Sequence, residues 1–202
     1  MKKLVSLILA LSIFVPMAHA QVYALPEEGD IRVSAGLGFS MLMRFDNTPH
    51  SRPIVPLTLQ GDYTILTFAD GYGSLAAGLM LEFASYKTWS TDKQAADVGF
   101  KTTTHQTWAL ITPMVIGRYC FDDDYEAHAK VFIGRGTCVR WKQEYSDPSY
   151  YDIIPPVNRP TGFPGWGLNV GAGKFINENM IISAELGLGS YTTLGVSLGY
   201  KF

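Results

Sequence analysis

Apolar and polar residues alternate with a period of two through the last ten positions of the chain. The apolar positions are Leu194, Val196, Leu198, Tyr200 and Phe202, and the positions between them hold Thr, Gly, Ser or Lys. Successive side chains of a β-strand point to opposite faces, so this pattern predicts a strand with one apolar face and one small or polar face.

The same alternation recurs in seven earlier segments, which are bounded by clusters of Gly, Asp, Asn and Pro. We predict strands at about 31–43, 54–66, 73–86, 106–121, 125–141, 164–176, 180–190 and 192–202. Eight sequential strands predict an all-β fold, an eight-stranded antiparallel up-and-down β-barrel.

The connections between the predicted strands alternate in length. Tight turns are expected near 69–71, 122–124 and 177–179, and long linkers at about 44–53, 87–105 and 142–163. This alternation is typical of transmembrane barrels with short periplasmic turns, and it predicts that both termini are periplasmic. The connection at 190–192 is short, which predicts a barrel rim that is low on one side.

Two kinds of eight-stranded barrel fit this pattern: a transmembrane barrel with its apolar face outward, or a secreted, lipocalin-like barrel with that face inward. Aromatic residues near the strand ends favour the transmembrane barrel, because such side chains settle at the headgroup level of a bilayer. The predicted girdle at one end holds Tyr63, Phe121, Tyr200 and Phe202, and that at the other end Phe39, Phe83, Trp108, Trp141 and Trp166.

The overall composition resembles that of a soluble domain, with 47% hydrophobic residues and a formal charge of −2. A transmembrane barrel exposes only alternate residues to lipid, so an unremarkable average is expected for it too. The near-neutral charge argues against nucleic acid as a partner.

The N-terminus has the features of a secretory signal peptide. Lys2 and Lys3 precede an apolar run from Leu4 to Met17, and Ala18-His19-Ala20 provides a small-x-small cleavage site. We therefore divide the chain into a signal peptide (1–20), a periplasmic N-terminal segment (21–30) and the barrel (31–202).

Charged residues fall on the predicted inward positions of the strands. The interior of an eight-stranded barrel is just wide enough for side chains to fill, so these charges are expected to pair and to plug the lumen. Glycines at other inward positions would leave room for them. The predicted lumen polar network is Arg32, Asp62, Glu82, Arg118, Glu126, His128, Lys130, Glu185 and Lys201.

The two cysteines are predicted to remain free thiols. If Cys120 lies near the 122–124 turn, Cys138 stands about 11 residues further along the hairpin, or roughly 35 Å away. A disulfide needs Cα atoms within about 7 Å of each other.

No catalytic, cofactor or metal site is predicted. His50 and His105 have neighbouring hydroxyl residues but no carboxylate at a spacing that would orient them, and His128 lies close to the predicted periplasmic turn. The acidic run 122–124 lacks the alternating spacing of a calcium loop and reads as a solvated turn.

Recognition of a partner is expected in the outer loops, where a rigid scaffold leaves the chain free to vary. Loop 142–163 combines several tyrosines with prolines and could bind an extracellular ligand. Cations near the outer side are candidates for contact with anionic lipopolysaccharide phosphates, namely Arg44, Arg52, Lys87, Lys93 and Lys101. Arg135 interrupts an outward apolar face, which suggests a bulge or a position at the outer interface.

Three stretches resemble the small outer-membrane β-barrels common in Bacteroidota, which share the architecture of OmpA/OmpX-type barrels. They are Ile182 to Gly189 (ISAELGLG), Gly195 to Phe202 (GVSLGYKF) and Thr112 to Phe121 (TPMVIGRYCF). The resemblance implies the outer membrane of a Gram-negative cell, with the last strand as the signal for the barrel-assembly machinery.

For function, the sequence predicts a monomeric structural or surface-interaction barrel in contact with outer-membrane lipids and lipopolysaccharide. A narrow, porin-like pore of low conductance is the main alternative. A lipid-modifying enzyme and a secreted ligand-binding barrel are the others.

Overall fold

The computed structural model describes residues 25–39, 51–53, 55–91, 101–121, 124–147, 161–189 and 192–202. The predicted signal peptide lies outside them. The strands are β1 (Ile31–Phe39), β2 (Ser51–Pro53), β3 (Leu57–Phe68), β4 (Gly73–Thr91), β5 (Lys101–Phe121), β6 (Tyr125–Tyr145), β7 (Phe163–Phe175), β8 (Met180–Leu188) and β9 (Leu194–Lys201). Among the described residues, no helix has the length and apolar character needed to cross a membrane.

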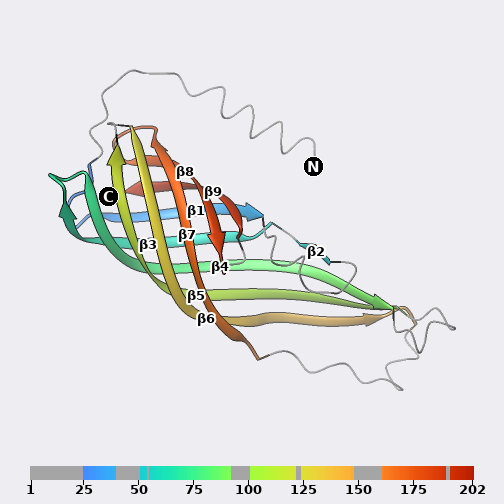
Figure 1. The fold of residues 1–202 in the computed structure, drawn as a ribbon. Coiled ribbons are helices and arrows are strands. Elements are labelled where there is room, and N and C mark those ends of the chain that lie inside the picture. The colour runs from blue at the N-terminus through green and yellow to red at the C-terminus, as the bar shows by residue number, and fades with distance from the viewer. Residues whose placement is uncertain are drawn as a thin grey trace.

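The eight long strands form a closed ring in which each strand pairs with its neighbours in an antiparallel manner (Figure 1). The order around the ring is β4, β3, β1, β9, β8, β7, β6 and β5, and pairing between β4 and β5 closes it. Apart from the short β2, sequential strands lie side by side. The predicted eight-stranded antiparallel up-and-down barrel is therefore confirmed.

Both ends of the barrel domain lie at the end that carries the tight turns. The backbone N–H of Phe202 donates to the carbonyl oxygen of Ile31 at 2.9 Å, which joins the last strand to the first. The β3–β4 connection lies at this same end, where Ala69 and Asp70 take positive φ values of 53° and 55°. We call it the turn end.

At the opposite end, β4, β5 and β6 extend well beyond the other strands (Figure 1). Antiparallel pairing of β4 with β5 continues from Lys87 opposite His105 to Thr91 opposite Lys101. The prediction of a loop at 87–105 is therefore wrong for residues 87–91 and 101–105, which belong to β4 and β5. We call this region the extension. It consists of residues 85–91 of β4, 101–107 of β5 and 140–145 of β6.

The other two predicted linkers also contain strand residues. Residues 142–145 continue β6, and Phe163 begins β7. Residues 51–53 form β2, which pairs with the extension of β4. By contrast, β8 and β9 are short, so the low rim predicted on that side is confirmed.

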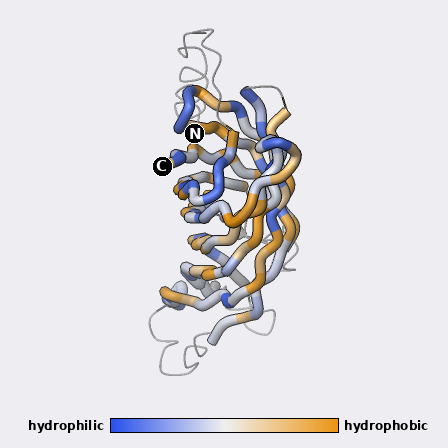
Figure 2. Tube along the Cα trace, turned by 90° about the vertical axis from the view of Figure 1, so that its left-hand side faces the viewer, coloured by the Kyte–Doolittle hydropathy of each residue, from blue (hydrophilic) through white to orange (hydrophobic). Residues whose placement is uncertain are grey.

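The outer surface of the barrel is apolar, because one parity of each strand faces outward. Figure 2 shows hydrophobic and hydrophilic positions alternating along the strands. On β5, outward apolar residues run from Phe121 through Val115 to Ile111, and all three are exposed. This ten-residue distance corresponds to about 33 Å of strand, or about 25 Å along the axis of a typically tilted barrel. It matches the height of the apolar band in outer-membrane barrels.

A β-bulge in β6 shifts the facing of the residues that follow it. Trp108 pairs with Cys138 and Thr107 with Arg140, which leaves Val139 as the extra residue. Arg140 therefore shares the outward face with Thr107, whereas Trp141 shares the inward face with Gln106. A bulge is one of the two explanations that the sequence suggests for Arg135, and the structure has it four residues further on. Arg135 itself stays on the outward face opposite Ile111.

Candidate functional site

The candidate site is the set of charged side chains that crosses the barrel lumen. Arg32 of β1 and Glu126 of β6 come from opposite sides of the ring and form a bidentate pair. Arg32 Nη1 and Nη2 donate to the two carboxylate oxygens of Glu126 at 2.8 and 2.9 Å. Both side chains are buried. Such a planar fork gives an ion pair both strength and a fixed geometry.

A second pair lies beside the first and is joined to it. Arg118 of β5 donates through Nη2 to Asp62 of β3 at 2.5 Å, and its Nε lies 3.7 Å from Glu126 Oε1. Arg118 and Asp62 are also buried. Two guanidinium groups therefore share Glu126.

His128 and Lys130 extend the network toward β8. His128 lies between two carboxylates, with Nδ1 3.6 Å from Glu126 and Nε2 3.2 Å from Glu185. Lys130 Nζ lies 2.6 Å from Glu185 and donates to Gln60 at 2.9 Å.

Two amide side chains complete the arrangement. Gln60 donates to Asp62 at 3.3 Å, which closes a circuit through Arg118, Glu126, His128, Glu185 and Lys130. Asn169 donates to the second oxygen of Glu185 at 3.1 Å. Within this circuit and its Arg32 branch, three permanent cations (Arg32, Arg118 and Lys130) balance three carboxylates (Asp62, Glu126 and Glu185). Within this set, charges of opposite sign lie next to each other, which offsets the cost of burying them in a low-dielectric interior.

The predicted network has two further residues, Glu82 and Lys201, and Glu82 lines a lumen cavity together with Gln60, Lys130 and Glu185 of the circuit. Glu82 is buried on β4, 3.4 Å from Thr58 Oγ1. Lys201 lies at the turn end, where it donates to the carbonyl oxygen of Leu25 at 3.1 Å and lies 3.5 Å from Asp30. Lys201 therefore ties the segment before β1 to the barrel.

The lumen also holds apolar side chains that the sequence analysis did not select. Met80, Met114, Ile116 and Phe132 form a buried cluster next to the circuit, toward the extension. Cys120, Phe175 and Ile181 form another near the turn end, with Leu25 packed against it. These residues stand at inward positions of the strands, as the charged residues do. Strand parity was therefore the signal that could have identified them.

Two cavities beside the circuit are small. Each has a volume of about 20 Å³. A buried water needs about 10–15 Å³ of such volume, so each cavity has room for about one water.

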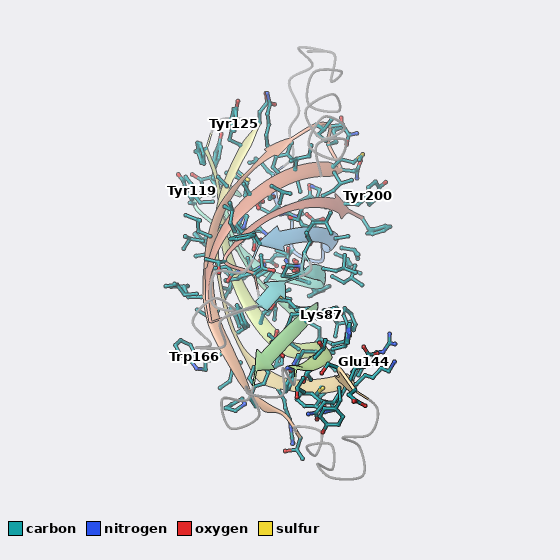
Figure 3. The ribbon with its side chains drawn as sticks, turned by 90° about the vertical axis from the view of Figure 1, so that its right-hand side faces the viewer. Lys87, Tyr119, Tyr125, Glu144, Trp166 and Tyr200 are labelled. Carbon is teal, nitrogen blue, oxygen red and sulfur yellow. The ribbon has the colours of Figure 1, made fainter. Side chains whose placement is uncertain are left out.

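Seven of the nine predicted girdle residues lie on the outer surface, with exposed fractions between 37% and 70% (Phe39, Tyr63, Phe83, Phe121, Trp166, Tyr200 and Phe202). Figure 3 shows Trp166 projecting away from the barrel wall.

Trp108 and Trp141 do not belong to the girdle. Trp108 is 7% exposed, donates to Gln106 at 3.0 Å and contacts Phe163 at a ring distance of 5.4 Å. Trp141 shares its inward face because the Val139 bulge reverses the parity.

Beyond the apolar band, four basic residues stand on the outer face of the extension among the side chains that the structure describes. They are Lys87, His105, Arg140 and Lys142, which we call the basic face. They line a cavity of about 250 Å³ together with Ser85, Thr107 and Glu144. Figure 3 shows Lys87 and Glu144 in this part of the molecule.

Among the described residues that line this cavity, Glu144 is the one carboxylate. It lies 2.6 Å from Lys142 Nζ and 3.6 Å from His105 Nε2. The hydrogen bond and charge of Lys142 lower the pKa of Glu144 below its ordinary value. His105 thus has a carboxylate neighbour that the sequence analysis did not find, and it lies in a strand rather than a loop. His50 lies outside the described residues.

Cys120 and Cys138 are free and buried, as predicted. In the β5–β6 ladder, Cys120 stands opposite Glu126, whereas Cys138 stands opposite Trp108, far along the same hairpin. Among the described residues, no group of three or more His, Cys, Asp or Glu side chains could hold a metal ion.

Comparison with known proteins finds no matching family model and no matching curated protein. Among solved structures, a designed transmembrane β-barrel is 13% identical, with a TM-score of 0.48, and the alignment covers 88% of this chain and 98% of the other. Ail of Yersinia pestis, solved with the heparin analogue sucrose octasulfate, is 12% identical over 87% of this chain and 100% of its own, with a TM-score of 0.42. The N-terminal β-barrel domain of Pseudomonas aeruginosa OprF is 10% identical over 87% and 98%, with a TM-score of 0.39. These similarities are too weak to indicate a function, and the specific resemblance to Bacteroidota barrels stays a prediction.

Proposed function

We propose that the chain is a closed barrel of the bacterial outer membrane that conducts no ions and holds the extension at the cell surface. The observation that carries this proposal is the combination of an apolar outer band with an ion-paired lumen. The band suits lipid contact, and the circuit fills the cross-section that a pore would need. The role is structural or surface-interacting, and no reaction is assigned to it.

The orientation and partners belong to the same proposal. The turn end faces the periplasm and the extension faces the exterior, as short turns and long connections do in such barrels. The last strand, β9, would be the segment that the barrel-assembly machinery recognises. The predicted ligand loop is shortened, since its residues 142–145 are strand, and its residues 148–160 lie outside the described chain.

Conductance across a planar bilayer tests the proposal against the narrow-pore alternative. Purified protein that has been refolded into lipid should insert without reproducible unitary current steps. Insertion is checked independently by protease protection of the barrel in sealed vesicles. Regular steps from inserted protein would instead show a pore, and failure to insert would refute the transmembrane assignment.

A further inference from the structure

The basic face begins where the apolar band ends. We infer that it binds the phosphate groups of lipid headgroups in the outer leaflet of the membrane. The inference rests on the proposed function, because that proposal places the extension on the outer side of the bilayer.

The strand register places Arg140 at headgroup depth and the other three basic residues one row above it. Among the described side chains of β4, Phe83 is the last exposed apolar one, and Arg140 lies in the next outward row, opposite Thr107. One row further, Lys87, His105 and Lys142 stand side by side. Rows are two residues apart, so these cations lie about 7 and 13 Å of strand beyond Phe83. The polar interface of a bilayer extends about 5–8 Å beyond its hydrocarbon core, which brings Arg140 within the headgroup layer. Lys87 and Lys142 start above this layer and reach its phosphates by extending their long side chains back toward the membrane.

The charge of the cavity suits an anion. Lys87, Arg140 and Lys142 are cationic and Glu144 is anionic, which leaves a net charge of +2 before His105 is counted. Ser85 and Thr107 add hydroxyl groups, which bond each other at 2.9 Å. A volume of about 250 Å³ lies just below the range of sites for drug-sized molecules, so it suits a headgroup rather than a whole ligand.

The neighbouring apolar surface favours a lipid over a soluble polyanion. Phe83 and Ile111 lie on the same outer face as the basic residues and are 37% and 52% exposed. A phosphorylated lipid could place its phosphate on the basic face and its acyl chains on this surface at the same time. A soluble polyanion would use the charges alone.

Lipid binding by the refolded full chain can be measured with native mass spectrometry in neutral detergent. The probes are lipid A with two phosphates, the same lipid after enzymatic removal of both phosphates, and inositol hexakisphosphate as a soluble polyanion. We expect phosphorylated lipid A to bind at least tenfold more tightly than either of the other two.

A series of charge variants assigns this preference to the basic face. Each exposed cation near an anionic lipid surface contributes about fivefold to binding, so Lys142→Gln should weaken binding of phosphorylated lipid A about fivefold and Lys87→Gln/Lys142→Gln about 25-fold. Glu144→Gln removes the opposing charge and should tighten binding. Lys174→Gln removes one exposed cation near the turn end and should leave binding unchanged. Far-UV circular dichroism confirms that each variant is folded.

The inference is overturned if the dephosphorylated lipid binds as well as lipid A, or if Lys142→Gln and Lys174→Gln behave alike. Binding of inositol hexakisphosphate as tightly as lipid A overturns the lipid assignment in favour of a soluble polyanion. Insertion into vesicles is scored separately, so protein that inserts but lacks a phosphate preference refutes only this inference.

Discussion

At the scale of single residues, Glu126 has the most demanding position in the lumen. It is 1% exposed and is approached by Arg32, Arg118 and His128. A buried carboxylate with several partners holds those partners in place, because each would otherwise be a buried charge without compensation.

We expect Glu126→Gln to destabilise the folded barrel by about 3–5 kcal/mol, because it leaves buried guanidinium groups without their shared carboxylate. Urea unfolding in lipid vesicles, followed by tryptophan fluorescence, measures the effect. Glu178→Gln makes the same chemical change at an exposed turn residue and should change stability by less than about 0.5 kcal/mol. Equal unfolding midpoints for the two variants would contradict the ion-paired lumen.

A second residue-scale prediction concerns the glycine beside the circuit. A Cβ atom at Gly171 would lie 2.6 Å from His128 Nε2 and 2.6 Å from the backbone oxygen of Ala184. Gly171→Ala should therefore cost about 1–3 kcal/mol of stability, as overpacking does. Gly61→Ala is the matched control, since a Cβ there meets no atom within 4 Å. Similar thermal midpoints for both variants would show that the lumen has spare room.

Strand parity explains which residues of the site could be predicted from the sequence. Arg32, Asp62 and Arg118 stand at inward positions of regular strands, so their placement follows from counting by two. Trp108 also stands at an inward position, yet its aromatic character suggested the girdle. The partners of each charge depend on the ring closure and on side-chain reach, which the pattern along one strand does not contain.

At the scale of elements, the extension is the largest departure from the sequence prediction. Its residues include Thr88 and Thr102 to Thr104, whose side chains are β-branched but polar. They place polar groups on both faces of the strands. Without an apolar face the period of two disappears, so a paired strand looks like a loop. The β-propensity of threonine was the remaining signal.

The bulge at Val139 makes a prediction about facing. In single-cysteine variants, Arg140→Cys should react rapidly with a water-soluble maleimide, because the residue is exposed on the outward face. Trp141→Cys should react at least tenfold more slowly, because that position lies on the inward face, where the Trp141 Nε1 atom is buried. Cys120 and Cys138 are replaced by Ser in this background.

Deletion of Val139 provides the control for the same experiment. Without the extra residue, inward Cys138 should be followed directly by outward Arg140 and inward Trp141, so the labelling order of the two positions should stay the same. In a strand without a bulge, the same deletion would exchange the two faces of every later residue. A reversed labelling order would therefore contradict the bulge at Val139.

At the scale of the whole molecule, two groups of side chains close the lumen, one ionic and one apolar, and they follow one another along the barrel axis. The ion pairs around Glu126 fill the lumen nearer the turn end, and the cluster of Met80, Met114, Ile116 and Phe132 lies toward the extension. The two groups meet where Ile116 stands opposite Lys130 and Met80 opposite Gln60. The sequence predicted a polar plug, because charged inward positions stand out. Apolar inward positions merge with the outward apolar residues in composition, so the second barrier was not found.

Two barriers in series predict how conduction responds to substitution. Asp62→Ala/Arg118→Ala removes an ion pair without leaving either charge alone, and Phe132→Ala removes the largest side chain of the apolar cluster. Each change by itself should leave the barrel silent in a planar bilayer, because the other level stays filled. The triple variant Asp62→Ala/Arg118→Ala/Phe132→Ala should show reproducible unitary steps.

The apolar level can be distinguished from the ionic one by salt. A pathway in the triple variant still passes the charged groups Arg32, Glu126 and Lys130, so raising the salt concentration should screen them and weaken any selectivity for ion charge. Steps from Phe132→Ala alone would show that the ionic circuit does not close the lumen. A silent but inserted triple variant would place a further barrier elsewhere. The first candidate is the segment before β1, which Lys201 ties to the turn end and whose Leu25 packs against the buried cluster there. Truncation of this segment would test it.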